Sequence, residues 1–202
     1  MFSRLLRNFL MEKVKTVIFG GSFDPIHVGH ISLATEVVKS GLANEVWFMV
    51  SPQNPHKEQC NLSDENVRLK MVDLAIADNK HFKACDFEFS LPRPSYTITT
   101  LTALEESFPD REFVLLVGAD NWEKFDRWYK HDEILARYRI IVYPRDNSAV
   151  PVVLPDGVTW LSAQLHDVSS TQIRALVADG KSISGLVPAK VDEFINRNNL
   201  YK

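Results

Sequence analysis

Short apolar runs alternate with segments of helical periodicity over most of this chain. The first apolar run, 17–19, stops at Gly20 and Gly21, which predicts a buried strand that feeds a tight turn. Similar runs predict strands at 45–50, 82–89, 112–117, 139–143 and 158–161. Strands that alternate with helices predict an α/β fold: a Rossmann-like, doubly wound and mostly parallel sheet with helices on both faces.

The predicted helices begin at polar residues that can cap them. Ser63 is the expected N-cap of a helix whose apolar residues lie within 67–76, and Ser95 is a candidate cap for a helix that follows it. Another helix is expected near 131–137. The hydroxyls of Ser169, Ser170 and Thr171 are candidate caps for a later helix.

Composition fits an ordinary soluble protein of 202 residues, with 45% hydrophobic and 24% charged residues. A net charge of −3 argues against a general nucleic-acid binder, and no apolar run reaches the length of a membrane span. Two isolated cysteines, Cys60 and Cys85, fit a reducing compartment, so we expect a cytoplasmic protein; one structural disulfide is the alternative.

We find no repeat or long linker, so residues 14–202 are predicted to form a single domain. Residues 1–13 are read as an N-terminal extension, of which 1–10 are basic, apolar and free of acids. Met11 is the favoured functional start, which would make residues 1–10 dispensable. A weak organelle-targeting segment is the alternative.

The junction after the first strand has the features of a polyphosphate site. Gly20 and Gly21 carry no Cβ and allow close approach of a ligand, and a helix N-terminus attracts phosphate. His27 and His30 are three residues apart, so they can share one face of the first helical turn. Zinc binding is a second hypothesis, but no nearby cysteine or acidic pair completes a ligand set.

The run GGSFDPIHVGH at 20–30 resembles the signature of the HxGH nucleotidyltransferase superfamily, with Ser22 where threonine is more usual. SSTQIR at 169–174 resembles the second signature of that superfamily. The resemblance implies catalytic roles for His27, His30, Lys57 and Arg174. It also implies an ATP site made by Gly20, Gly21, Ser22, Phe23, His27, His30, Ser169, Ser170, Thr171 and Arg174. The implied cofactor is Mg²⁺, held mainly by the ATP phosphates, with no metal site on the protein.

Two further segments narrow the resemblance to bacterial nicotinate-nucleotide adenylyltransferases. RPSYTITTL at 93–101 is similar to their PSYT segment, and Gly118 to Trp128 is similar to the region that holds an acid and a stacking tryptophan. The mononucleotide site implied by this likeness comprises Ser22, Lys57, Tyr96, Thr97, Asp120, Trp128 and Arg145.

The expected reaction is adenylyl transfer from ATP to nicotinate mononucleotide, which gives deamido-NAD and pyrophosphate. The expected partners are those two nucleotides, with no nucleic acid and no membrane, and the oligomeric state is left open. The alternatives are another HxGH adenylyltransferase, acting on pantetheine phosphate or nicotinamide mononucleotide, a cytidylyltransferase, or a non-catalytic nucleotide-binding regulator.

Overall fold

Strands and helices alternate in the computed structural model, which describes residues 12–52, 62–144, 153–162 and 166–202. The strands are β1 (Val14–Gly21), β2 (Glu45–Val50), β3 (Phe82–Cys85), β4 (Arg111–Gly118), β5 (Arg139–Tyr143) and β6 (Val158–Trp160). The α-helices are α2 (Val28–Lys39), α3 (Glu65–Ile76), α4 (Thr97–Ser107), α5 (Ala119–Trp122), α6 (His131–Arg137), α7 (Ser170–Ala178) and α8 (Ala189–Arg197). Two short 3₁₀ helices are η1 (Phe87–Ser90) and η2 (Phe125–Arg127).

All six strands lie in one sheet, in the order β3-β2-β1-β4-β5-β6. Each pairing within it is parallel. This confirms the Rossmann-like α/β prediction. The strand order reverses between β1 and β4, and such a reversal opens a crevice at the carboxyl ends of the strands.

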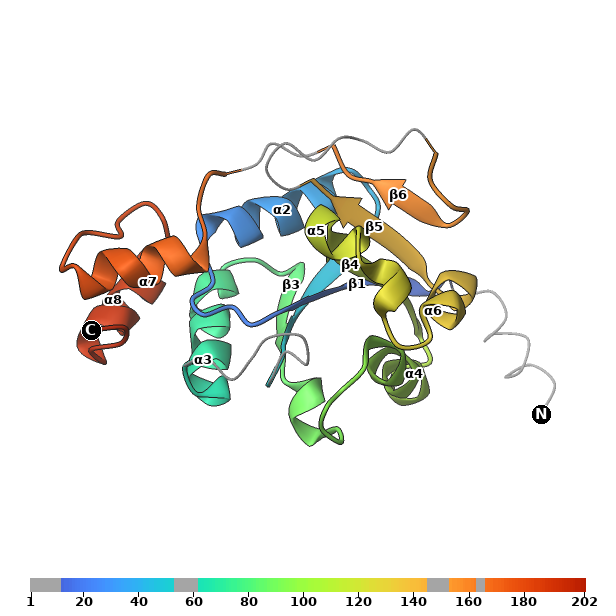
Figure 1. Ribbon diagram of the computed structural model, residues 1–202, viewed down its shortest axis with the longest axis horizontal. Helices are drawn as coiled ribbons and strands as arrows, with labels where there is room; N and C mark the ends of the chain where they lie inside the picture. The colour runs from blue at the N-terminus through green and yellow to red at the C-terminus, as the bar shows by residue number, and fades with distance from the viewer. Residues whose placement is uncertain (1–11, 53–61, 145–152, 163–165) are drawn as a thin grey trace.

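Helices cover both faces of the sheet (Figure 1). Successive side chains of a strand point to opposite faces, so Val17 and Phe19 enter the layer that contains α2, α3, α7 and α8. Ile18, between them, enters the layer that contains α4 and α6. Strand β2 contributes to both layers, which explains why 46–50 is apolar throughout.

Three local predictions were wrong. Strand β3 ends at Cys85, not near 89, because the chain turns into η1 and buries Glu88. The N-cap of α3 is Asp64, not Ser63: its carboxylate accepts hydrogen bonds from the N–H groups of Asn66 and Val67, 2.9 and 3.3 Å away. Helix α4 starts at Thr97 with Tyr96 as its N-cap residue, and the hydroxyl of Ser95 instead bonds Glu88.

In the part of the chain that the structure describes, no helix is long and apolar enough to span a bilayer. Strand β1 begins at Val14, but residues 1–11 lie outside the described residues, so the division at residue 13 stays a prediction. Cys85 is a buried free thiol whose pKa is raised by burial, and Cys60 lies outside the described residues.

Candidate active site

The loop from Ser22 to His27 connects β1 to α2 at the crevice beside β4. Its sharp turn is carried by Phe23, whose φ of +48° is uncommon for a residue with a Cβ. The Phe23 ring is 1% exposed and packs edge-on against Phe19, with centroids 5.5 Å apart. The side chain of Phe23, a residue predicted for the ATP site, is therefore part of the core.

The two glycines before this loop differ in their surroundings. A Cβ added to Gly21 would lie 3.0 Å from the ring of Phe23. A Cβ added to Gly20 would meet none of the described atoms within 4 Å, and Gly20 is exposed. Gly21 thus serves the packing of the turn, whereas Gly20 opens onto the crevice.

His27 and His30 lie together at the start of α2, as predicted, but in different roles. His27 is the N-cap residue and His30 lies in the first turn. Their rings stack with centroids 3.6 Å apart and an angle of 27° between planes. The backbone N–H of His27 donates to Nδ1 of His30 at 3.2 Å. His27 is only 6% exposed, so most of its ring is enclosed by the protein.

Helix α7 joins the second predicted motif directly to this loop. Ser169 caps the helix by accepting from the N–H of Gln172. Ser170 Oγ donates to the carbonyl of Pro25 at 2.9 Å, and Arg174 Nη1 donates to the carbonyl of Asp24 at 2.7 Å. The bonded residues are 145 and 150 positions apart in the chain, so the two signatures come together in one site.

Thr171 has a smaller role in this contact: its hydroxyl accepts from Nη2 of Arg174 at 3.3 Å. Arg174, half-buried, thus uses part of its guanidinium to hold the loop. Its remaining donor capacity is what a phosphate clamp needs.

Two buried charged residues that the sequence reasoning missed support the loop from beneath. Asp24 and Arg68 are each 1% exposed. Arg68 Nη1 donates to the carbonyls of Ser22 at 2.7 Å and Ser51 at 2.8 Å, and Nε donates to the carbonyl of Ser63. Burial lowers the pKa of Arg68, and the charge of Asp24 opposes that shift. In the sequence, Arg68 lies among the apolar residues of α3 and gives no sign of these distant partners.

The predicted mononucleotide residues lie around the start of α4. Thr97 is its first residue, and Tyr96, 40% exposed, packs against Tyr129 with centroids 4.7 Å apart and an angle of 41° between the rings. Trp128 is half-buried and packs on Phe125 at 5.2 Å. The structure therefore brings the PSYT segment next to the tryptophan segment, as the resemblance requires.

Asp120 lies at the carboxyl end of β4, the strand beside β1. A Cβ added to Gly118 would lie 2.6 Å from its Oδ1 and 3.1 Å from the hydroxyl of Tyr143. Tyr143 in turn packs edge-on against Phe19 of β1, with centroids 5.9 Å apart. The strand ends of β1, β4 and β5 thus lie around the crevice, with one exposed carboxylate among them.

Glu88 is a third buried charged residue that the sequence did not predict. It is 9% exposed and accepts a hydrogen bond from Thr100 Oγ1 at 2.9 Å. Burial raises its pKa, and hydrogen bonds from Thr100, Ser51 and Ser95 act in the opposite direction. Glu88 therefore ties the end of β2 to the turn that precedes α4.

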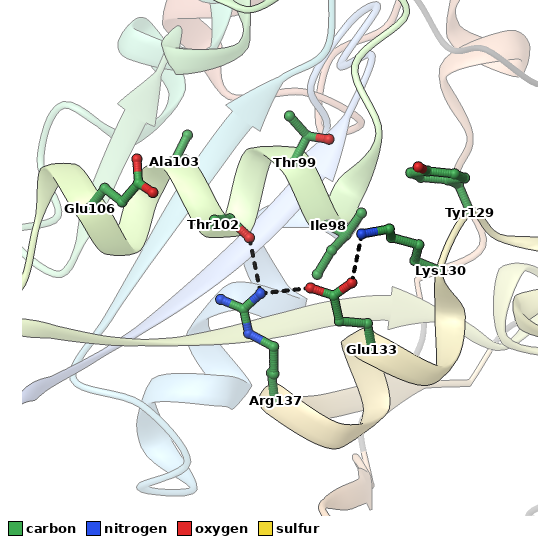
Figure 2. A pocket seen from close by; sticks show the side chains of 9 residues that line it. All are labelled: Ile98, Thr99, Thr102, Ala103, Glu106, Tyr129, Lys130, Glu133 and Arg137. Atoms are coloured by element: carbon green, nitrogen blue, oxygen red, sulfur yellow. Dashed lines mark hydrogen bonds and ion pairs between the residues drawn. The ribbon is translucent and has the colours of Figure 1, made fainter.

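A pocket of about 390 Å³ lies between α4 and α6. Figure 2 shows four of its polar side chains joined by hydrogen bonds: Arg137 bonds Thr102 and Glu133, and Lys130 bonds Glu133. None of the residues predicted to bind a nucleotide lines this pocket, and three of its four charged residues, Lys130, Glu133 and Arg137, are paired with one another.

Lys57 and Arg145, predicted for the catalytic and mononucleotide sites, lie outside the described residues. Within the described ranges, no group of three or more His, Cys, Asp or Glu side chains is placed to hold a metal ion.

Comparison with known proteins identifies the family. The cytidylyltransferase-like family model matches residues 18–176, which include both signatures. The chain belongs to the cytidylyltransferase-like family. A Bacteroides fragilis protein named probable nicotinate-nucleotide adenylyltransferase is 47% identical over 174 residues, covering 86% of this chain and 87% of that protein. A Bacteroides thetaiotaomicron protein of the same name is 44% identical over 185 residues, covering 91% and 92%.

Solved structures agree on the fold of this cytidylyltransferase-like chain. Plasmodium falciparum nicotinic acid mononucleotide adenylyltransferase complexed with NaAD superposes with a TM-score of 0.76. It is 17% identical, and the match covers 93% of this chain and 97% of the other, so the likeness supports the fold alone. Together with the Bacteroides relatives, the family match confirms the predicted place among nicotinate-nucleotide adenylyltransferases.

Proposed function

We propose that this protein transfers the adenylyl group of ATP to nicotinate mononucleotide, a step of NAD biosynthesis. The observation that carries the proposal is the direct bonding of Arg174 and Ser170 to the loop that leads to His27. It supports one phosphate site at the crevice between β1 and β4. The substrate is taken from the Bacteroides relatives, which are named probable nicotinate-nucleotide adenylyltransferases.

The chemistry needs no base on the protein. A phosphate oxygen of the mononucleotide, already an anion, forms a bond to the α-phosphorus of ATP, and the bond from that phosphorus to the bridging oxygen breaks. Pyrophosphate leaves with the electron pair. The protein contributes by positioning the two nucleotides and by stabilising charge on the phosphates.

Within this proposal, His27 and His30 donate to the α-phosphate and the bridging oxygen. Arg174 and Lys57 hold the departing pyrophosphate, and the first turn of α7 adds N–H donors. The backbone from Gly20 to Phe23 borders the ATP. Mg²⁺, carried mainly by the ATP phosphates, would neutralise part of their charge when bound.

The mononucleotide is proposed to bind between the start of α4 and the segment that holds Trp128. The N–H groups of the first turn of α4 and the hydroxyl of Thr97 suit a carboxylate, and Trp128 suits stacking on a pyridine ring. Ser22, Tyr96, Asp120, Lys57 and Arg145 complete the proposed subsite.

The deciding experiment is a substrate panel. Purified protein is given ATP and Mg²⁺ with nicotinate mononucleotide, nicotinamide mononucleotide or phosphopantetheine, and pyrophosphate and the adenylylated product are measured. We expect turnover with nicotinate mononucleotide above all. Turnover with phosphopantetheine alone would favour the pantetheine enzyme, and ATP binding without pyrophosphate release would favour a regulator.

We also propose that residues 14–202 form the catalytic domain and that, within the extension 1–13, residues 1–10 are dispensable. A chain starting at Met11 should keep its thermal midpoint and its turnover. Loss of folding would show that the extension belongs to the domain.

A further inference from the structure

The carboxylate of Asp24 lies in the middle of the proposed catalytic loop, yet it faces the protein interior. It is 1% exposed. Its Oδ1 accepts a hydrogen bond of 2.6 Å from the hydroxyl of Tyr201, and its Oδ2 accepts one of 3.2 Å from the N–H of Ser63. A buried carboxylate is costly unless such donors satisfy it. Tyr201, 177 positions further along the chain, therefore supplies a hydrogen bond that the Asp24 carboxylate needs.

Tyr201 reaches Asp24 through an unusual backbone path. Tyr201 and Asn199 both have positive φ, +62° and +51°, a region that is unfavourable for residues with a Cβ. Such conformations persist where surrounding contacts determine them. The hydroxyl also lies 3.8 Å from Sδ of Met71. Burial and then the bond to Asp24 raise the pKa of Tyr201, so its hydroxyl remains a donor at every physiological pH.

Asp24 is also the point where other anchors of the loop meet. Its carbonyl accepts from Arg174, and the next carbonyl, of Pro25, accepts from Ser170. Arg68 holds the carbonyl of Ser22 on the other side. A shift of Asp24 would therefore move Arg174 and, three residues along the chain, His27.

We propose that Tyr201 is a positioning residue of the adenylyl-transfer reaction: its hydroxyl fixes Asp24 and thereby aligns Arg174 and His27. The proposal rests on the proposed function for its kinetic readout. In this role Tyr201 makes no contact with a substrate. It acts only through Asp24, which makes its effect separable from general stability.

Tyr201→Phe removes the hydroxyl alone, and Tyr138→Phe is its matched control. The hydroxyl of Tyr138 also donates to a carboxylate, Glu105 Oε2 at 2.8 Å, and Tyr138 is 4% exposed in the layer on the opposite face of the sheet. Both variants lose one tyrosine–carboxylate bond. The thermal midpoint should fall in both variants, and further in Tyr201→Phe, because Asp24 is buried whereas the Glu105 side chain is 41% exposed and also bonds Arg137. The value of kcat/KM for ATP should fall at least ~10-fold in Tyr201→Phe only.

A double-mutant cycle with Asp24→Asn tests the route. If Tyr201 acts through Asp24, the double variant is no slower than the slower single variant. The proposal would be overturned if the losses in kcat/KM for ATP multiply in the double variant. It would also be overturned if kcat/KM for ATP of Tyr201→Phe lies within twofold of that of Tyr138→Phe. If neither Tyr201→Phe nor Asp24→Asn folds, the pair is a folding requirement only and the proposal is equally refuted.

A readout without turnover separates this inference from the proposed function. The imidazole resonances of His27 and His30 are recorded by NMR in the parent, Tyr201→Phe and Tyr138→Phe proteins. Shifts confined to Tyr201→Phe support the positioning role even if the parent makes no deamido-NAD, which would refute the proposed reaction alone. Unchanged resonances in a folded Tyr201→Phe protein would refute the positioning role.

Discussion

The backbone N–H of His27 donates to Nδ1 of His30 across 3.2 Å, so the first turn of α2 determines the tautomer of one of its own side chains. An imidazole nitrogen that accepts carries no proton, and in the neutral ring the proton then belongs to the other nitrogen. Nε2 of His30 is therefore a donor, which is the form suited to a phosphate oxygen.

This arrangement predicts a graded series at His30. His30→Ala should lower turnover at least ~100-fold, the scale for losing one aligned donor. His30→Gln places an amide donor near the position of Nε2 and should recover part of the rate. His30→Asn keeps only the acceptor near Nδ1, so it should retain folding without the rate. Turnover and thermal unfolding of the three variants are the measurements, and equal rates for Gln and Asn would contradict the donor role.

Arg174 is expected to affect ATP more than the mononucleotide. Arg174→Ala should raise KM for ATP about 10-fold or more, because it removes a phosphate donor and the bond to the Asp24 carbonyl. Arg174→Lys should restore little of the affinity for ATP, since a single ammonium group does not reproduce the planar, two-pronged donor geometry of a guanidinium. The control is Lys181→Ala, an exposed lysine just beyond α7 that pairs with Asp179. A larger effect on the mononucleotide would mean that the two subsites are exchanged.

Gly20 and Gly21 should separate binding from folding. Gly20→Ala places its methyl group in open space and should leave the thermal midpoint nearly unchanged, while raising KM for ATP about 10-fold if phosphate lies there. Gly21→Ala drives its Cβ to 3.0 Å from the Phe23 ring and should destabilise by about 1–3 kcal/mol. Thermal unfolding and ATP kinetics test both. An unchanged KM in Gly20→Ala would show that the nucleotide keeps away from the end of β1.

Glu88 should make stability fall as pH rises. Its folded-state pKa is raised by burial above the usual 4.5, so between those two values the unfolded chain has released its proton while the folded chain keeps it. The folded state then binds more protons, and the free energy of unfolding decreases with increasing pH. The stability contribution is complete below about pH 4.5 and is lost as pH passes the raised value.

Glu88→Gln removes that dependence. The free energy of unfolding of the variant, relative to the parent, should therefore increase from pH 4.5 upward, as measured by urea unfolding at several pH values. Glu106→Gln, at an exposed glutamate of α4, is the control. A difference between Glu88→Gln and the parent that stays constant across the pH range would argue against an uncharged Glu88 in the folded protein.

The start of α4 should favour the acid form of the substrate over the amide. N–H donors and the Thr97 hydroxyl suit a carboxylate, whereas the amide NH₂ would leave donors unpaired at about 1–3 kcal/mol for each buried group. We expect at least ~10-fold preference in kcat/KM, which needs about 1.4 kcal/mol. Thr97→Ala should reduce the ratio of kcat/KM between the acid and the amide, and Trp128→Ala should lower kcat/KM for both mononucleotides by a similar factor. Equal use of the two mononucleotides by the parent would exclude this pocket.

The sequence predicted those parts of the fold that depend on local pattern. Glu45–Val50 and Arg139–Tyr143 are strands with the predicted bounds, and His131–Arg137 is a helix with the predicted bounds. Their apolar runs end at turn or cap residues, so the neighbouring residues in the chain determine where these elements begin and end. The motifs after β1 and at α7 were equally visible, and the structure brings them together.

The features that could not be predicted from the sequence depend on contacts between residues that are far apart in the chain. Phe87 and Phe89 continue a strand pattern, but Glu88 between them turns inward to meet Thr100, and the strand stops. Arg68 looks like an exposed position of α3, yet its guanidinium satisfies the carbonyls of distant turns. Such residues are polar in sequence and buried in the fold, and only the three-dimensional path of the chain identifies their partners.

The bonds from Ser170 and Arg174 to Pro25 and Asp24 also have a consequence for biosynthesis. Elongation at about 5–20 residues per second separates the loop from these anchors by roughly 7–30 s. Strands β1 to β5 can pair during that interval, but the turn before His27 then has only its earlier partners, such as Arg68, and lacks its bonds to Ser170, Arg174 and Tyr201. A nascent chain thus acquires its sheet well before its phosphate site, and pairings of such long sequence separation are the slow ones in folding.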